Sequence, residues 1–200
     1  MQPCTRGPAP TLLATHGQSV GADYAARRGA DPAFEFRWPR RDGQSLYDEA
    51  HAGVSAMTDQ HCAYCDGFPL DATGREEVDH FKPKSRPEFY PLVCDWTNLF
   101  LCCTACNGAK REQWDADLLR PDAPGYAFEA YFEYRFDTGE LRPASTASAE
   151  AQRRAGRTIE ILDLNRAGNC ANRKRARRCY SRGDQEGNDF RFLPALCDRA

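Results

Sequence analysis

The spacing of apolar residues is most regular between residues 46 and 58, where it predicts an amphipathic helix. Ser45 stands directly before this segment and Asp48 follows three residues later, which is the pattern of an N-terminal capping box. One face of the predicted helix is apolar and comprises Leu46, Ala50, Val54 and Met57. This helix leads the chain to the first of two cysteine pairs.

Two short apolar segments in the middle of the chain predict strands. The first covers residues 77–81 and ends before Pro83, and the second covers residues 96–102. Residues 84–94 contain prolines and are expected to form a loop between them. A helix is expected from residue 104 to residue 119. The order strand, loop, strand, helix predicts an α+β fold.

The C-terminal part is expected to add a hairpin and two helices. Aromatic and polar residues alternate in part over residues 130–136, and the turn residues 137–139 then allow a second strand over residues 140–142. Small and apolar residues recur at helical spacing over residues 149–162, and residues 172–178 form a strongly basic helical segment. The last twenty residues are expected to be loosely ordered.

These patterns divide the chain into three parts. Residues 1–59 form a helical and irregular segment, in which prolines and glycines leave only short helical turns around residues 11–14 and 22–28 before the first clear helix. Residues 60–120 hold the predicted core. Residues 121–200 hold the hairpin and the later helices, which are candidates for contact with a partner or with DNA.

The composition narrows the class of protein. The 200 residues are 41% hydrophobic, which is enough for one domain with an appendage, and the net charge is −2. Electrostatic attraction to DNA must therefore come from a local patch of positive charge, or a partner must supply part of it. No apolar segment is long enough to cross a membrane, and the first ten residues do not resemble a secretion signal, so a cytoplasmic protein is expected. In that reducing compartment ten cysteines indicate metal binding more than disulfides.

Four of the cysteines form two C-x-x-C pairs, which is the spacing of a four-thiolate zinc site. These are Cys62 with Cys65 and Cys103 with Cys106. The alternatives are unpaired core thiols or a thioredoxin-like redox pair, but no βαβ pattern surrounds Cys62. The remaining six cysteines are expected to be free thiols: Cys4, Cys94, Cys102, Cys170, Cys179 and Cys197.

Polar residues between and beside the pairs suit the hydrolysis of a phosphodiester, which needs a base, a divalent cation and a group that orients the base. His80 is the candidate base, and Asp79 and Asn107 are candidate oxygen ligands for Mg²⁺. Asn98 is the candidate orienting residue, although a backbone carbonyl can orient the ring while Asn98 ties the loop. Each residue also has an ordinary alternative: a histidine satisfied by a neighbour, a helix-capping asparagine or a loop asparagine.

Cations close to these residues are candidates for phosphate contact. Lys82, Lys84 and Arg86 follow the candidate base, and Lys110 and Arg111 follow Asn107 by one helical turn; all suit contact with a nucleic-acid backbone. A solvated charged face is the alternative for each of them. The basic segment 172–178 suits either DNA or a partner protein.

These residues resemble the HNH, or ββα-metal, endonuclease superfamily over about residues 60–115. His80 matches the first position of the motif, Asn98 the middle one and Asn107 the last, which is His in many members and Asn in others. The resemblance implies that zinc in the cysteine pairs is structural and that Mg²⁺ or Mn²⁺ is catalytic. It also implies that the predicted core is a zinc-stapled ββα-metal core with flanking helices.

A narrower set is similar over more of the chain, namely the HNH nuclease subunit of the Septu anti-phage system, also found as an effector in some retrons. The strings that carry this resemblance are Cys62-Ala-Tyr-Cys65, Asp79-His80-Phe81-Lys82-Pro83-Lys84-Ser85, Asp95-Trp96-Thr97-Asn98-Leu99, Leu119-Arg120-Pro121, Arg6-Gly7-x-x-Pro10 and Thr158-Ile159-x-x-Leu162-x-Leu164-Asn165. Many members carry Glu where Asp79 stands here, and the segment after Arg178 departs from their pattern. The resemblance implies a partner ATPase of the ABC or SMC-like type and a role in phage defence.

The sequence therefore predicts a metal-dependent HNH endonuclease that cleaves DNA and acts with an ATPase. Two alternatives remain open at this point. One is a stand-alone restriction-type HNH nuclease, and the other is a zinc-binding module that binds nucleic acid or protein without catalysis.

Overall fold

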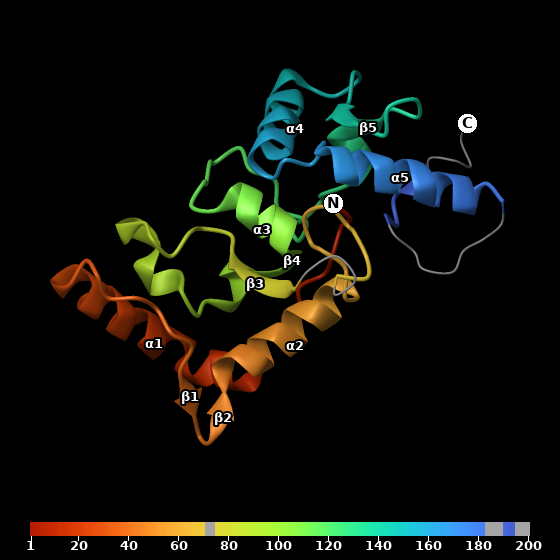
Figure 1. The fold of residues 1–200 in the computed structure, drawn as a ribbon. Helices are drawn as coiled ribbons and strands as arrows, with labels where there is room; N and C mark the ends of the chain where they lie inside the picture. Colours follow the sequence, from red (N-terminus) through yellow and green to blue (C-terminus); the bar gives the residue numbers. More distant parts are fainter. Residues whose placement is uncertain (71–74, 183–189, 195–200) are drawn as a thin grey trace.

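The structure, a computed structural model, describes residues 1–70, 75–182 and 190–194. Within these ranges the chain is a mixed α and β protein with α-helices, short 3₁₀ segments and three two-stranded antiparallel sheets (Figure 1). None of the described cysteines forms a disulfide; Cys4, Cys94, Cys102, Cys170 and Cys179 are free thiols, as expected, whereas Cys197 lies outside the described residues. None of the described helices combines the length and the apolar composition that crossing a membrane requires.

The centre of the molecule is an antiparallel strand pair followed directly by a helix. Strand β3 (Glu76–His80) pairs with β4 (Leu99–Cys103), and α3 (Thr104–Lys110) begins at the next residue. All five residues of β4 are buried, which explains why this strand appears as a continuous apolar segment in the sequence. The predicted order of strand, loop, strand and helix is confirmed.

Two boundaries in this unit differ from the prediction. Helix α3 is shorter than expected, because Arg111 has a φ angle of +47°, which a right-handed helix does not accommodate. The segment Trp96–Asn98 forms a 3₁₀ turn instead of the start of the second strand. The Asp95 carboxylate caps this turn by accepting a hydrogen bond from the amide of Thr97 at 2.8 Å.

The N-terminal segment is more regular than predicted. Instead of two short turns, α1 (Thr11–Ala30) is one helix of 20 residues. It packs against the 3₁₀ helix Pro87–Leu92, which lies in the segment expected to be a loop. A Cβ atom on Gly21 would overlap the carbonyl oxygen of Pro91, and Gly17 makes a similar close approach. These glycines therefore serve helix packing, whereas the sequence pattern suggested that they interrupt the helix.

Helix α2 (Leu46–Thr58) has the predicted bounds and cap. The hydroxyl of Ser45 accepts a hydrogen bond from the amide of Asp48 at 3.2 Å. A small hairpin of β1 (Arg40–Arg41) and β2 (Gln44–Ser45) precedes it. The buried face of α2 packs against β4, so the helix supports the central strand pair from the side opposite α3 (Figure 1).

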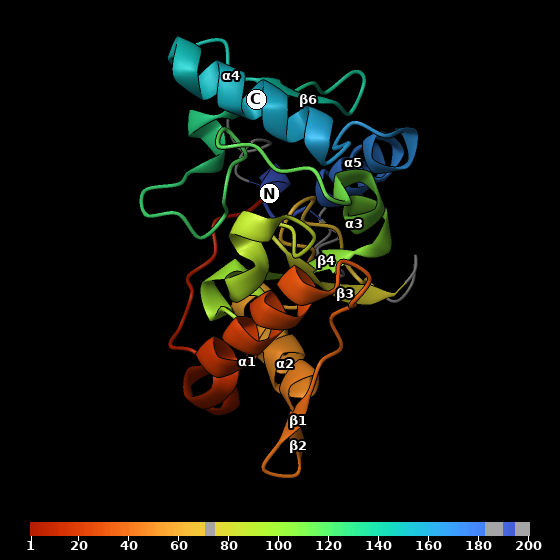
Figure 2. The ribbon, with the colours of Figure 1, turned by 90° about the vertical axis from the view of Figure 1, so that its left-hand side faces the viewer.

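The C-terminal part contains the predicted hairpin and helices. Strands β5 (Phe132–Tyr134) and β6 (Leu141–Pro143) are antiparallel, α4 (Ala149–Ile161) packs on β6, and α5 (Ala167–Tyr180) extends beyond the predicted basic segment at both ends. Figure 2 shows α4 and β6 at one end of the molecule and the β1–β2 hairpin at the other. The hydrophobic core includes residues from all three predicted parts, and the division into these parts stays a prediction.

Residues 190–194 are packed, although the end of the chain was expected to be loosely ordered. The ring of Phe192 stacks on Phe128 with centroids 4.4 Å apart. The Arg191 guanidinium forms an ion pair with Asp66 at 2.6 Å, and Asp66 is fully buried. The expectation is therefore wrong for this segment, and the neighbouring stretches 183–189 and 195–200 lie outside the described residues.

Candidate functional site

The two cysteine pairs come together as predicted. The Sγ atoms of Cys62, Cys65, Cys103 and Cys106 lie within 4.8 Å of one another, and all four residues are buried. Backbone amides point at the sulfur atoms: the Cys103 amide donates to Cys62 Sγ at 3.4 Å, and the Cys106 amide donates to Cys103 Sγ at 3.4 Å. Such donors stabilise thiolates, and four thiolates at this separation suit a tetrahedral ion. The cluster can hold a metal ion such as zinc.

A guanidinium that sequence reasoning missed lies against this cluster. Arg166, directly before α5, places its Nη atoms 3.5 Å from Cys106 Sγ and 3.6 Å from Cys103 Sγ. Burial by itself would lower the pKa of Arg166, but the charge of the nearby Cys106 thiolate raises it. Four thiolates around a divalent ion carry excess negative charge, so Arg166 compensates part of it. Arg166 lies sixty residues from Cys106, so no local sequence pattern could have predicted this contact.

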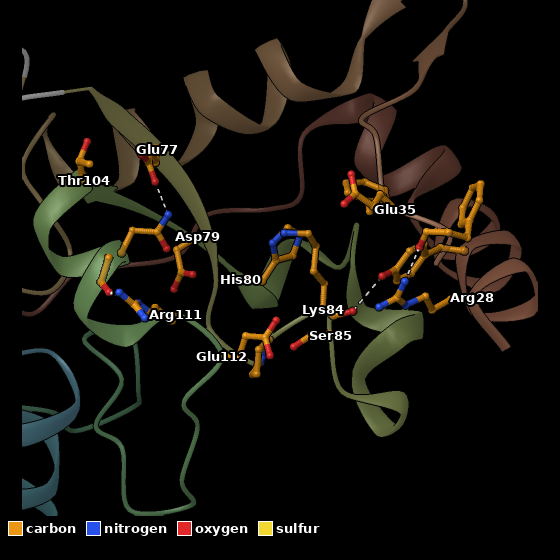
Figure 3. A pocket seen from close by; sticks show the side chains of 16 residues that line it. Arg28, Glu35, Glu77, Asp79, His80, Lys84, Ser85, Thr104, Arg111 and Glu112 are labelled. Atoms are coloured by element: carbon orange, nitrogen blue, oxygen red, sulfur yellow. Dashed lines mark hydrogen bonds between the residues drawn. The ribbon is translucent and has the colours of Figure 1, made fainter. Parts of the chain in front are cut away.

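A cavity of about 640 Å³ lies beside the strand pair (Figure 3). Its lining includes Asp79, His80 and Asn107, so the structure brings three of the four predicted catalytic residues to one pocket. Asp79 and His80 come from the end of β3, and Asn107 comes from α3. Figure 3 also shows cations around the pocket, with Arg111 on the side of Asp79 and Arg28 on the opposite side.

Asp79 is buried and accepts two kinds of hydrogen bond. The hydroxyl of Tyr64 donates to Oδ2 at 2.5 Å, and the ammonium of Lys110 lies 3.0 Å from the same Oδ2 and 3.1 Å from Oδ1. Lys110 is itself fully buried and also donates to the carbonyl oxygen of His80 at 2.7 Å. Lys110 is therefore an internal partner of Asp79 in this structure, whereas the sequence suggested a phosphate contact.

Glu77 is a second acidic residue of the pocket, and sequence reasoning did not single it out. The amide of Asn107 donates a hydrogen bond to the Glu77 carboxylate, and both residues line the cavity (Figure 3). Glu77 and Asp79 are two residues apart on β3, so they share one face of the strand. This period of two was the signal in the sequence that could have identified Glu77.

His80 is held as a neutral imidazole. Its Nε2 lies 2.9 Å from the carbonyl oxygen of Val93, and because a carbonyl only accepts, Nε2 carries the proton and Nδ1 keeps a free lone pair. The ring of Trp38 stacks on it with centroids 5.9 Å apart. Burial, followed by the positive charge of Lys84, lowers the pKa of His80 to about 4. The lone pair is therefore available for a proton at neutral pH.

Asn98 holds the loop that carries this carbonyl. Its side-chain oxygen accepts from the amide of Lys82 at 2.8 Å, and its side-chain nitrogen donates to the carbonyls of Lys82 and Leu92 at 3.1 and 3.2 Å. Leu92 precedes Val93, the residue that binds the His80 ring. The arrangement corresponds to the expected alternative in which a backbone carbonyl orients the ring and Asn98 ties the loop.

The three predicted cations that follow the candidate base differ in their contacts. Lys84 is exposed and lines the cavity. The Lys82 ammonium lies over the ring of Phe89, 5.5 Å from its centroid, and Arg86 donates to the carbonyl of Trp114 at 3.4 Å. Of the cations predicted after the candidate base, Lys84 is thus the one whose position faces the pocket.

Comparisons with known proteins relate part of the chain to one group. No protein-family profile matches the sequence. The chain is similar to two curated Septu proteins. It is 29% identical over 86 residues to Septu protein PtuB of Bacillus mycoides strain KBAB4, which covers 36% of this chain and 29% of the relative. It is 33% identical over 73 residues to Septu protein PtuB of Bacillus thuringiensis, covering 35% of this chain and 27% of the relative. The chain thus matches less than a third of the length of these distant relatives.

Proposed function

We propose that this protein is a metal-dependent HNH endonuclease that hydrolyses DNA phosphodiester bonds. One observation carries the proposal: a neutral imidazole and a set of oxygen ligands line the same pocket, on the strand pair and helix that the cysteine cluster joins. The order of β3, β4 and α3 also agrees with the ββα arrangement of that superfamily. Zinc is proposed for the four cysteines and Mg²⁺ or Mn²⁺ for the pocket.

The donor set of the pocket fits such a cation. Asp79, Glu77 and the amide oxygen of Asn107 are hard oxygen ligands of the kind that Mg²⁺ prefers, and one or two protein carboxylates with water complete such sites. A carboxylate has about four acceptor positions, so Asp79 can bind a cation while Tyr64 and Lys110 hold it. A bound Mg²⁺ or Mn²⁺ supplies neutralisation of charge on the phosphate and on the leaving oxygen.

The residues of the chain perform the other parts of the reaction. His80 Nδ1 takes a proton from a water molecule as that water attacks the phosphorus, because the Val93 carbonyl fixes the tautomer with Nδ1 unprotonated. The bond between phosphorus and the leaving oxygen breaks, and that oxygen takes up a proton from solvent. Burial keeps the imidazole neutral before the step, and Trp38 stacks on its ring. Lys110 links Asp79 to His80, because its ammonium donates to the Asp79 carboxylate and to the backbone carbonyl of His80.

The similarity to Septu protein PtuB supports a place in an anti-phage defence system. We propose that an ATPase of the ABC or SMC-like type acts with this chain, and that DNA is its substrate. The net charge of −2 agrees with this arrangement, because a partner can supply the electrostatic attraction to DNA that this chain lacks overall. A stand-alone nuclease is distinguished by cleavage activity that stays the same when the ATPase is added.

Cleavage of supercoiled plasmid by the zinc-loaded protein in Mg²⁺ or Mn²⁺ tests the proposal. The comparison uses His80→Ala, with His16→Ala as the matched control, because His16 lies in α1 away from the pocket lining. We expect nicking or linearisation by the parent and the control, and none by His80→Ala or in EDTA. Cleavage that survives His80→Ala would remove this residue as the base.

The competing function is a zinc-binding module without catalysis, and the Lys110–Asp79 ion pair is the observation that favours it, since it neutralises the candidate ligand internally. Such a module would bind DNA or a partner equally well with His80 replaced. A folded protein with zinc that cleaves neither alone nor with the co-purified ATPase would support this alternative.

A further inference from the structure

Arg111 has a backbone conformation that is unusual for its residue type. Its φ and ψ angles are +47° and −120°, a region that glycine adopts readily and that residues with a Cβ atom rarely adopt. It directly follows the last residue of α3, and its amide donates to the carbonyl of Asn107 at 2.8 Å. Glycine adopts this conformation without steric cost. Strained residues of this kind cluster at active sites and ligand-binding sites.

The side chain of Arg111 belongs to the same pocket as the candidate catalytic residues. It lines the cavity with Asp79, His80 and Asn107 and is exposed to solvent. Its Nε donates to the carbonyl of Gly108 at 3.1 Å. Among the residues that the structure describes, no ion pair involves this guanidinium, and its terminal nitrogens have no acceptor.

The contrast with other arginines makes this position distinctive. Arg120 binds Asp122 and the carbonyl of Thr97, and Arg191 binds Asp66. These guanidinium groups have structural partners that explain why an arginine is present. The guanidinium of Arg111 faces a pocket, and the backbone conformation at this position disfavours any residue with a side chain. A structural role alone therefore does not explain why an arginine stands here.

We infer that Arg111 binds a non-bridging oxygen pair of the nucleic-acid phosphate that is cleaved in this pocket, and so positions that phosphate. The inference rests on the proposed function. A planar guanidinium matches the geometry of phosphate oxygens and binds them through two hydrogen bonds. The pocket also holds the carboxylates of Glu77 and Glu112, which repel an approaching phosphodiester. Arg111 offsets that repulsion on the α3 side of the pocket, where Figure 3 shows it with Asp79.

Three substitutions separate the role of the side chain from the strain of the backbone. Arg111→Gly removes both, Arg111→Gln removes the charge and keeps the strain, and Arg111→Lys keeps the charge without the fork. Arg135→Gln is the control for the change in net charge, because Arg135 is exposed on the β5–β6 hairpin and pairs with Asp137. Each protein is assayed for melting temperature, plasmid cleavage in Mg²⁺, and binding of a short DNA duplex in Ca²⁺ by fluorescence anisotropy.

We expect Arg111→Gly to melt about 2–4 °C higher than the parent, because the strain is relieved. The same variant and Arg111→Gln should lose about 100- to 1,000-fold in cleavage rate, as expected when one donor to the reacting group is removed. Arg111→Lys should retain an intermediate rate, and Arg135→Gln should match the parent in both properties.

The outcomes distinguish this inference from the proposed function. If the parent cleaves DNA and Arg111→Gly cleaves it equally well, the role of Arg111 is overturned and the nuclease proposal stays intact. A parent that cleaves nothing but binds the duplex more tightly than Arg111→Gln would support the phosphate contact and count against catalysis by the isolated chain. Equal binding by parent and Arg111→Gln, with no cleavage, would overturn the inference.

Discussion

The buried ion pair between Lys110 and Asp79 makes a quantitative prediction about stability. Lys110 is fully buried, and its ammonium lies 3.0 Å from the Asp79 carboxylate. At that separation and an effective dielectric constant of about 20, the Coulomb attraction is about 5.5 kcal/mol. Lys110→Met keeps the length of the side chain but leaves a carboxylate buried without its cation, and breaking a buried pair in this way lowers the free energy of unfolding by about 3–5 kcal/mol.

Urea denaturation followed by circular dichroism measures this loss. The matched control is Lys84→Met, because Lys84 is exposed and its replacement should change the free energy of unfolding by less than about 0.5 kcal/mol. The double variant Lys110→Met with Asp79→Asn should be more stable than Lys110→Met alone, since no buried charge is then left unpaired. A loss below about 1 kcal/mol for Lys110→Met would refute the reasoning that this pair is buried and intact.

The same variant tests whether Asp79 is a metal ligand. If Mg²⁺ binds at Asp79, it replaces the missing positive charge, so the Lys110→Met protein should gain more stability from Mg²⁺ than the parent does. A cation present at about 100 times its dissociation constant stabilises by about 2.7 kcal/mol. The gain should disappear when Asp79→Asn is added. Equal responses of all three proteins to Mg²⁺ would place the cation elsewhere.

Two further predictions concern the cysteine cluster and the first helix. Arg166→Ala should release zinc to a chromogenic chelator at least about tenfold faster than the parent, because the substitution removes the guanidinium next to two of the thiolates. The control Arg153→Ala, at an exposed position, should not change the rate of zinc release. Equal rates for Arg166→Ala and the parent would contradict charge compensation. Gly21→Ala should lower the free energy of unfolding by about 1–3 kcal/mol, because the added methyl group overlaps Pro91. Gly29→Ala in the same helix has open space around it and should raise the free energy of unfolding by up to about 1 kcal/mol; thermal melting measures both. A Gly21→Ala protein as stable as the parent would show that α1 does not approach the Pro91 carbonyl closely.

Local patterns were enough to predict part of the fold. The helix over residues 46–58 has its cap, apolar face and end within one short segment, and the hairpin around residues 137–139 depends on adjacent residues. Helix α1 was predicted wrongly because its glycines disfavour a helix by propensity, and the reason that they are present lies in a segment about seventy residues further along the chain. Tertiary packing decided this element.

The candidate site shows the same distinction between local and distant information. The cysteine spacing predicted the cluster, and the residues around His80 predicted the lining of the pocket. The internal role of Lys110 and the contact of Arg166 with the thiolates involve partners 31 and 60 residues away in sequence, so a single sequence offers no signal for them. The stacking of Trp38 on His80 is likewise a contact between residues distant in sequence.

Helix α3 joins the cysteine cluster to the candidate active site. Cys103 caps it, Cys106 lies in its first turn, Asn107 follows at once and Lys110 ends it. A helix of seven residues is too short to be stable by itself in water, so its position depends on contacts outside the helix. The cysteine cluster supplies such a contact at one end, and the Lys110–Asp79 pair supplies one at the other. Loss of the metal should therefore disturb the position of Asn107 as well as the stability of the cysteine cluster, which couples the two proposed metal sites through one turn of helix.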